Sequence, residues 1–551
     1  MKRPHQTYWE IIWKQYRRHR LGLLALMIVA LFCLVGIYAP LLASSKPLLL
    51  KYEGRWYFPL FRYLFFTGFY TKYLDVFYNL LMFTLPIFIA AWFGLRRWHQ
   101  ARSLLFGLLI LFQCSFFLYL VLRQQDDPAS SVELNRAKQK ELQAYLIARK
   151  TDPLTTPPLL PDWNRELEYL TPYARLNIIL QYQERFRQDQ RLQANQKAYA
   201  AKAALKGKTD QAIPSLWHFD RLREQEELGR QRQIIGDLQK EYLENKQIVD
   251  RFAGISTQLS QSDQSAWMTA KSIVDRYELA QARIKYIEDK SNWIRLQMDQ
   301  IHDELMPLIR PFHWEDDAGG EQDLNQYISW WDLTRINRKD MVAALIFGIR
   351  ISLSVGLLAI ALALLIGIPL GAVAGYYGGK MDIILFRLIE IWESMPTFFM
   401  LLMVVAFLQS KSIFLVIGVI GFFGWTNFSR FIRGEFFKQK QLPYVEACHA
   451  LGYSNRRIMF VHLLPNAIPP LLTLVPFAIM GAITSEAGLS FLGLGEEGSS
   501  SWGVLMDEGR SAFPSESYLL WPPAILLTLL LVSIAIVGDA FRDALDPKMH
   551  Y

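Results

Sequence analysis

The apolar residues of this chain are gathered into long runs, and a long polar stretch separates the third run from the fourth. A helix needs about 20 mostly apolar residues to cross a lipid bilayer. Eight runs meet that length: 21–43, 76–95, 102–122, 351–374, 383–408, 412–432, 467–487 and 519–538. The pattern predicts an all-α membrane protein with about eight spans and one polar insertion. We expect the first run to be retained, because it is too long for the apolar part of a signal peptide.

Two parts of the polar stretch, 125–340, have apolar residues spaced alternately by three and four, which is typical of helices that pack side by side. The first part carries Leu228, Ile235, Leu238, Tyr242, Val249, Phe252 and Leu259. The second part carries Ile273, Tyr277, Ala280, Ile284, Ile287, Ile294, Met298, Ile301, Leu305 and Leu308. We expect an antiparallel, coiled-coil-like helical hairpin about 45 Å long, at a rise of about 1.5 Å per residue. Such a hairpin can bury its own apolar stripe and bind nothing; docking of another molecule is the alternative.

Basic residues between the runs predict the orientation, since short cytoplasmic loops are rich in Lys and Arg. They are concentrated in 2–20, 96–102 and 430–457, whereas 488–518 is mostly acidic. Eight spans with a cytoplasmic N-terminus place the three basic segments inside and the polar stretch outside, so that both termini are cytoplasmic. Only the loop 44–75 disagrees, because it would lie outside with five Lys and Arg residues.

Composition narrows the class of protein. Hydrophobic residues make up 52% of the 551 positions, yet 20% are charged and the formal net charge is +8. The polar stretch holds 31 Lys and Arg against 34 Asp and Glu, so the basic excess belongs to the membrane-embedded parts. A nucleic-acid-binding protein would carry its basic face on a soluble domain. We therefore expect contact with the lipid bilayer and no nucleic-acid partner.

Few residues offer chemistry of their own. The three cysteines lie outside the polar stretch, and the nine histidines lack metal-ligand spacing, so neither a disulfide framework nor a metal is expected. Gly207-Lys208-Thr209 has the end of a phosphate-binding loop but lacks the required upstream glycine. We expect no catalytic residue, no metal and no cofactor, so any ATP hydrolysis must occur on a separate subunit.

The most informative motif lies in the basic segment between the sixth and seventh runs. It reads Tyr444-Val445-Glu446-Ala447-Cys448-His449-Ala450-Leu451-Gly452 and is followed by His462-Leu463-Leu464-Pro465-Asn466. It resembles the EAA loop of binding-protein-dependent ABC importer permeases, whose pattern is Glu-Ala-Ala, three residues, Gly, nine residues, then Ile-x-Leu-Pro. Cys448 stands where the family has its second alanine. His462 replaces the isoleucine, which is typical of the peptide-transporting branch.

The sequence on both sides of the loop resembles the same branch. The blocks 347–353, 486–495, 501–503 with 508–510, and 538–547 resemble segments of that branch, and residues 46–60 look like a C-type subunit of the oligopeptide and microcin group. Two departures stand out. The family has six spans, whereas this chain would have two more at 76–122, and 336–340 differs from the run that the family has before its second core span.

The resemblance implies a fold, a function and partners. The fold is a type I ABC importer permease core with an inserted extracytoplasmic helical domain, in a bacterial inner membrane. The function is that of a permease subunit for peptides or peptide-like solutes. It would form a heterodimer with a second permease subunit and work with two ATP-binding subunits and an extracytoplasmic solute-binding protein. Nickel, opines and peptide-like antibiotics remain open as cargo, and a membrane-anchored scaffold or sensor with a helical extracytoplasmic domain is the alternative from another class.

The resemblance also assigns roles to residues. In the family, the loop forms a short coupling helix that docks on the nucleotide-binding subunit. That implies a coupling role for Glu446, Ala447, Cys448, Gly452, Leu464 and Pro465. The small Ala447, Cys448 and Ala450 would form a thin docking face. Gly452 can adopt the positive φ that ends a helix, and Pro465 suits the start of the next one.

Charged residues within or beside the apolar runs are further candidates for function. Glu390 and Glu393 lie three positions apart on one helix face, where they either face the translocation path or pair with a neighbouring helix. Arg350, Arg430 and Arg433 lie near the ends of spans and are expected to extend toward the membrane surface.

These observations divide the chain into five segments. Residues 1–20 form a cytoplasmic amphipathic N-terminus, and 21–43 form the first core span. Residues 44–122 form an external segment plus an extra transmembrane hairpin, and 123–340 an extracytoplasmic helical domain. Residues 341–551 form the permease core, with the EAA loop at 433–466.

Overall fold

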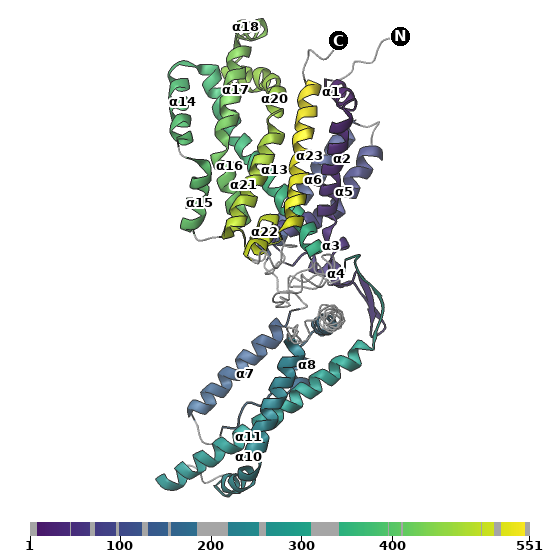
Figure 1. Ribbon diagram of the computed structural model, residues 1–551, viewed down its shortest axis with the longest axis vertical. Coiled ribbons are helices and arrows are strands. Elements are labelled where there is room, and N and C mark those ends of the chain that lie inside the picture. Colours follow the sequence, from purple (N-terminus) through teal and green to yellow (C-terminus); the bar gives the residue numbers. More distant parts are fainter. Residues whose placement is uncertain are drawn as a thin grey trace, which may run out of the picture.

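The computed structural model describes residues 8–44, 46–66, 72–94, 99–123, 130–151, 156–183, 219–252, 260–309, 341–394, 396–408, 411–496, 499–511 and 520–545. They form two bodies (Figure 1). One is a bundle of mostly apolar helices, here called the bundle. The other, called the arm, extends from one end of the bundle and contains the polar helices between 130 and 298. The turn at 96–98, the run 336–340 and the segment 207–209 lie outside the described residues.

The bundle is built from the chain on both sides of the arm. Its first part contains α1 (Tyr8–Tyr16), α2 (Arg20–Ile37), α3 (Ala39–Leu42), α5 (Tyr73–Gly94) and α6 (His99–Leu122). Its second part contains α13 (Met341–Tyr377), α14 (Gly379–Glu393), α15 (Thr397–Leu408), α16 (Ile413–Phe423), α17 (Trp425–Lys440), α18 (Pro443–Ala450), α19 (Asn455–Arg457), the π-helix η2 (Ile458–Leu463), α20 (Leu464–Leu472), α21 (Val475–Leu489), the π-helix η3 (Ser490–Leu494), α22 (Trp502–Ser511) and α23 (Trp521–Leu545).

Seven helices of the described chain are long and apolar enough to cross a membrane, and a bent pair makes up to eight. The expected run 383–408 is not one straight helix. It is divided into α14 and α15, which are inclined at 73°, and Pro396 lies between them. The expected run 467–487 is likewise divided between α20 and α21, close to Pro469, Pro470 and Pro476. Proline lacks the N–H that continues a helical ladder, which accounts for both breaks.

The central helix of the bundle, α13, packs unusually close to α17. A methyl group on Gly367 would lie 2.6 Å from the carbonyl oxygen of Trp425, and one on Gly375 would lie 2.6 Å from Cβ of Phe436. One on Gly371 would overlap the carbonyl oxygen of Ser429. Glycines four apart thus form a groove that receives the α17 backbone, as in membrane helices with small residues at this spacing. This contact fixes the helix that leads into α18.

A buried arginine connects the extra helix α5 to the rest of the bundle. Arg350 of α13 is fully buried, donates from Nε to the Gly36 carbonyl at 2.6 Å and from Nη2 to the Ile37 carbonyl at 3.1 Å, and pairs with Asp75 of α5 at 3.1 Å. The expectation that Arg350 extends toward the membrane surface is therefore wrong. Its guanidinium satisfies the last carbonyls of α2 and a carboxylate on α5, so three helices meet at one side chain.

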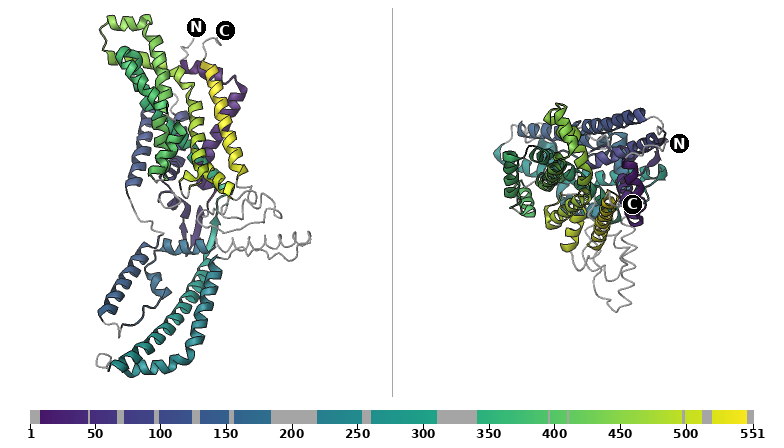
Figure 2. Two further views of the ribbon diagram at one scale, coloured as in Figure 1. Left: turned by 60° about the vertical axis from the view of Figure 1, so that its left-hand side comes forward. Right: turned by 90° about the horizontal axis from the view of Figure 1, so that it is seen from above.

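The arm contains α7 (Val132–Thr151), α8 (Trp163–Glu168), a helix at 172–183, and the long helices α10 (Phe219–Phe252) and α11 (Gln261–Met298). α10 and α11 lie side by side and antiparallel (Figures 1 and 2). The rings of Tyr242 and Tyr277 stack at 4.0 Å, and Lys246 lies 3.7 Å from Glu278. Nearer the other end of the pair, Arg283 lies 3.4 Å from Glu227.

A small sheet joins the arm to the bundle, so the expectation of an all-α protein is wrong in this detail. β1 (Leu49–Tyr52) pairs antiparallel with β2 (Arg55–Tyr57) on one side and with β3 (Ile301–Leu305) on the other. The second apolar stripe therefore does not continue as helix to Leu308. α11 ends at Met298, because the following residues provide the hydrogen bonds of an edge strand instead.

The basic loop 44–75 is part of this junction. Lys46 is buried and its Nζ donates to Oδ1 of Asn177 at 3.1 Å, and the Arg62 guanidinium lies 3.9 Å from the centre of the Tyr173 ring. The amide of Ile309 also donates to the Leu42 carbonyl at 2.7 Å. The loop thus belongs to the same end of the bundle as the arm.

Candidate functional site

The predicted coupling loop lies at the end of the bundle opposite the arm (Figure 1). α18 projects beyond α17 and α20, and α1 and the last turns of α23 lie at the same end. The left view of Figure 2 shows α18 as a short helix that crosses the top of the bundle. The site is therefore an exposed projection rather than a cleft.

Local sequence determines both ends of α18. Leu442 is extended, and Pro443 occupies the first helical turn, where its missing N–H costs nothing. Gly452 follows the helix with φ +73°. Its amide donates to the His449 carbonyl at 3.0 Å, while the Tyr453 amide donates to the Cys448 carbonyl at 3.1 Å. This pair of bonds is the Schellman motif, which needs a left-handed residue at the glycine position, as predicted.

The two faces of α18 have different partners. Val445 and Cys448 are buried and belong to the apolar core of the bundle. Glu446, Ala447 and His449 are exposed. Cys448 was expected on the docking face beside Ala447, but it points into the chain's own core, where a small thiol packs as an apolar group. The surface presented to the outside is therefore Glu446, Ala447, His449 and Ala450 with Leu451, which is 70% exposed.

Aromatic rings of neighbouring segments support α18. The Tyr376 ring, at the end of α13, lies 6.4 Å from the His449 ring, and its hydroxyl donates to Oδ1 of Asn455 at 2.9 Å. The Tyr453 ring stacks on His462 at 5.4 Å. Both α13 and the helical segment that follows α18 in the sequence thus support α18.

Leu464 and Pro465 lie where the chain re-enters the bundle. Pro465 is in the first turn of α20, as predicted, but α20 continues the preceding helical turns without a break. α19, η2 and α20 run consecutively from Asn455 to Leu472, and the part just before Pro465 is π-helical. A wider π turn relieves the clash between a proline ring and the carbonyl four residues earlier. Leu464 packs against the core, whereas Pro465 is exposed.

Glu390 and Glu393 of α14 both form ion pairs. Glu393 lies 2.5 Å from Arg430 of α17, and Glu390 lies 2.5 Å from Arg387 of its own helix. Arg433 of α17 pairs with Asp382 of α14, with Nη2 and Oδ2 2.8 Å apart. Two arginines of α17, the helix that leads to α18, therefore pair with acidic residues of α14.

Reading the sequence missed the polar cluster around Glu486, at the arm end of α21. Glu486 is buried, and its Oε1 accepts hydrogen bonds from Ser490 at 2.7 Å and Ser501 at 2.5 Å. The next residue, Trp502, is also buried and donates from Nε1 to the Leu345 carbonyl at 3.0 Å. These bonds fix α22 against α21 and α13. A glutamate inside an apolar run was the signal that could have identified this cluster.

Comparison with known proteins supports the reading of the motif. The family described as "Binding-protein-dependent transport system inner membrane component" matches residues 367–551, and "N-terminal TM domain of oligopeptide transport permease C" matches residues 7–53. The Haemophilus influenzae oligopeptide transport system permease protein OppC is 32% identical over 308 residues, which are 55% of this chain and 96% of that protein.

Two further relatives match over shorter regions. The Agrobacterium fabrum peptidoglycan transport system permease protein YejE is 38% identical over 40% of this chain and 58% of its own length. The Escherichia coli inner membrane ABC transporter permease protein YejE is 36% identical over 40% of this chain and 64% of its own length. A solved structure of the MetNI methionine ABC transporter covers 37% of this chain and 98% of its own, at 19% identity and a TM-score of 0.32, too low to support an argument about the fold.

Proposed function

This chain belongs to the family of inner-membrane components of binding-protein-dependent transport systems, and from that premise we propose that it is the permease subunit of an ATP-driven importer for peptides or peptide-like solutes. It is a multi-pass membrane protein, and in such importers separate subunits hydrolyse ATP. The relatives named for oligopeptide and peptidoglycan transport favour a peptide-like cargo.

The observation that carries this proposal is the geometry of α18. It is a short helix with one buried and one exposed face, it ends in a glycine turn, and it projects from the end of the bundle where α17 is tied to α14. We assign Glu446, Ala447, Gly452, Leu464 and Pro465, with Cys448 as the inward anchor, to coupling. Movement of a docked ATP-binding subunit would reach α14 and α15 through the ion pairs on α17. In this view Glu390 and Glu393 brace the moving helices rather than line the path.

The partners follow from the same assignment. A second permease subunit would complete a heterodimer, two ATP-binding subunits would dock at the α18 end, and a solute-binding protein would dock at the arm end. We propose that the α18 end is cytoplasmic, with both termini, and that the arm, 123–340, is an extracytoplasmic helical domain with coiled-coil-like packing in its longest hairpin. The loop 44–75 is compatible with this, because Lys46 and Arg62 contact the arm and share its side.

The test uses two glycines with matched geometry. Gly452 has φ +73° and Gly54, in the turn between β1 and β2, has φ +75°; a methyl group at either position would meet nothing within 4 Å. Valine at either site therefore introduces similar backbone strain, of about 1–3 kcal/mol, and its Cβ meets no neighbour. Gly452→Val is expected to reduce the ATP-binding subunit that co-purifies with the chain in mild detergent by at least about threefold.

Gly54→Val, at the opposite end, is expected to retain the wild-type amount of ATP-binding subunit, and both variants should insert into the membrane normally. Retention of that subunit by Gly452→Val at normal expression would show that α18 does not couple. Loss of it in both variants would show that the effect is general destabilisation.

A further inference from the structure

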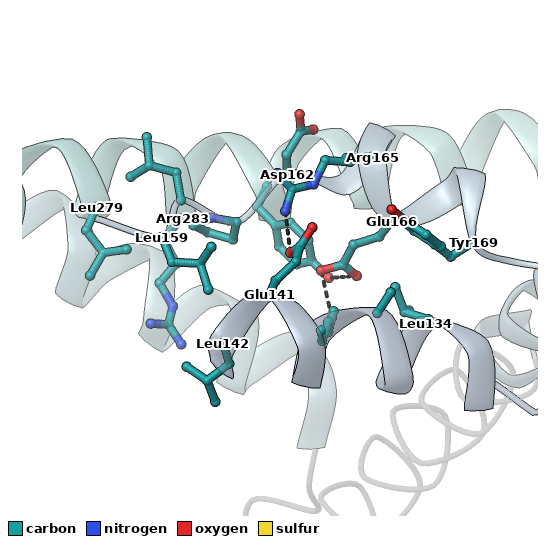
Figure 3. A pocket seen from close by; sticks show the side chains of 15 residues that line it. Leu134, Glu141, Leu142, Leu159, Asp162, Arg165, Glu166, Tyr169, Leu279 and Arg283 are labelled. Atoms are coloured by element: carbon teal, nitrogen blue, oxygen red, sulfur yellow. Dashed lines mark hydrogen bonds and ion pairs between the residues drawn. The ribbon is translucent and has the colours of Figure 1, made fainter. Parts of the chain in front are cut away.

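The arm contains a cavity that the importer function above does not use. It lies between α7, α8 with the segment that precedes it, and α11, and has a volume of about 430 Å³ (Figure 3). That volume is within the range of small-molecule sites, about 300–1,000 Å³. All of its lining residues come from the arm, so it is separate from α18 and from the bundle.

One end of the cavity is apolar and accessible to solvent. Leu142 of α7 and Leu159 and Leu160 of the segment before α8 line it together with Leu279 of α11. Leu142, Leu159 and Leu160 are 48%, 40% and 41% exposed. Figure 3 shows Leu142, Leu159 and Leu279 grouped on one side of the cavity, with Arg283 beside them. A ligand that covered these leucines would remove apolar surface from water, which favours binding.

The other end is formed by ion pairs. Glu166 accepts from Lys138 at 2.7 Å and from the Tyr286 hydroxyl at 2.9 Å, and Arg165 pairs with Glu141. The Glu166 side chain is only 13% exposed, whereas those of Lys138 and Arg165 are each 48% exposed. Burial, and then the adjacent Glu166 carboxylate, raise the pKa of Tyr286, so its hydroxyl stays a donor. Ammonium, guanidinium and carboxylate groups thus lie next to each other at the rim.

The charges select among possible occupants. The lining carries three Lys or Arg and three Asp or Glu residues, so its formal charge is zero. An anionic lipid would bring one sign of charge and a chain much longer than the leucine end. A short peptide carries an ammonium, a carboxylate and apolar side chains in one small molecule, and the cavity lining offers carboxylates, cations and exposed leucines for these three kinds of group.

We propose that this cavity binds a short zwitterionic peptide, with its termini at the Lys138–Glu166 and Arg165–Glu141 pairs and an apolar side chain among Leu142, Leu159 and Leu279. The inference rests on the proposed function, since it makes the ligand a member of the cargo class. The arm then holds a peptide beside the end of the bundle at which the solute-binding protein is proposed to dock, so the permease subunit contributes a peptide site of its own.

The experiment measures equilibrium binding of radiolabelled trileucine to the purified full chain in detergent. Leu159→Glu should raise Kd at least about tenfold, because it places a charge among the leucines. Arg165→Ala should raise it severalfold. Leu243→Glu is the matched control, since Leu243 is 66% exposed on α10 and does not line the cavity. Trileucine with acetylated and amidated termini should bind at least about tenfold more weakly than the zwitterion.

Absence of saturable binding up to millimolar trileucine would overturn the proposal, as would equal affinity of Leu159→Glu and Leu243→Glu. Equal affinity for capped and free trileucine would refute recognition of the termini. Displacement of the radiolabelled trileucine by phosphatidylglycerol but not by unlabelled trileucine would assign the cavity to lipid. The outcome is distinguishable from failure of the proposed function. If the chain retains its ATP-binding subunits through α18 but binds no trileucine, only the peptide site in the cavity is refuted. If the chain binds trileucine but retains no ATP-binding subunit, the proposed importer function is refuted.

Discussion

The buried pair of Arg350 and Asp75 offers the sharpest test of how the extra hairpin α5–α6 is attached to the bundle. Asp75→Ala removes the only carboxylate that pairs with this arginine among the described residues and leaves its charge fully buried. Removing one partner of a buried pair costs about 3–5 kcal/mol. Because the Asp75 side chain is 20% exposed, some water can reach the vacated site, and we expect the lower end, about 3 kcal/mol.

Two further variants separate charge from contact. Asp75→Asn keeps an oxygen that can accept from Nη1, so it is expected to cost less than Asp75→Ala. Adding Arg350→Met to Asp75→Ala removes the uncompensated charge and should recover about 1 kcal/mol or more, although the Gly36 and Ile37 carbonyls both lose this donor. The double variant must therefore be more stable than the sum of the single changes predicts.

The measurement is the temperature at which half of the detergent-purified chain loses its monodisperse peak in fluorescence-detected size exclusion. In order of falling stability we expect wild type first, then Asp75→Asn and the double variant in either order, and Asp75→Ala last. Glu390→Ala is the control, because its pair with Arg387 is exposed and should contribute less than about 1 kcal/mol. Asp75→Ala as stable as Glu390→Ala, or strictly additive single changes, would refute the argument.

Three other outcomes are expected. Gly371→Ala should destabilise the chain by about 1–3 kcal/mol and lower its melting temperature, because the added methyl group would overlap a carbonyl of α17. Gly418→Ala should leave the melting temperature unchanged, because a methyl group there meets nothing within 4 Å. In a cysteine-free background, a cysteine at Ser262 but not one at Ser454 should react with an impermeant thiol reagent in spheroplasts, and the reverse pattern would overturn the proposed orientation. Burial raises the pKa of Asp275, so its carboxylate is disfavoured in the folded arm, and Asp275→Asn should stabilise the chain at pH 7. Thermal melts over a range of pH should show this gain shrink as pH falls toward about 4, where the Asp275 side chain becomes protonated.

The sequence alone determined the class and the family of this protein. Within a bilayer, the backbone N–H and C=O groups of a run of about 20 apolar residues must hydrogen-bond to each other, and a helix satisfies all of them within the run. The spacing from Glu446 through Gly452 to Pro465 predicted the short helix, its glycine end and the following proline of the loop that we propose for coupling, since these are local features encoded by neighbouring residues. The positive φ of Gly452 was predictable for the same reason.

Other features were visible in the sequence but were not recognised. Gly367, Gly371 and Gly375 recur every fourth position, which predicts a close helix contact, although not with which helix. Prolines at 396, 469, 470 and 476 could have indicated that two apolar runs would be divided.

Only the tertiary structure decided the rest. Arg350 looked like a residue that reaches for the membrane surface, but carbonyls and a carboxylate more than 270 positions earlier hold it in the interior. Residues 301–305 continue a helical spacing, yet β1 supplies them with strand hydrogen bonds. Cys448 faces inward together with Val445, three positions earlier on the same helix face, and both belong to the core of the bundle. For Arg350 and for residues 301–305 the partner is distant in sequence, and a local pattern fixes which residues share a face but not what that face will contact.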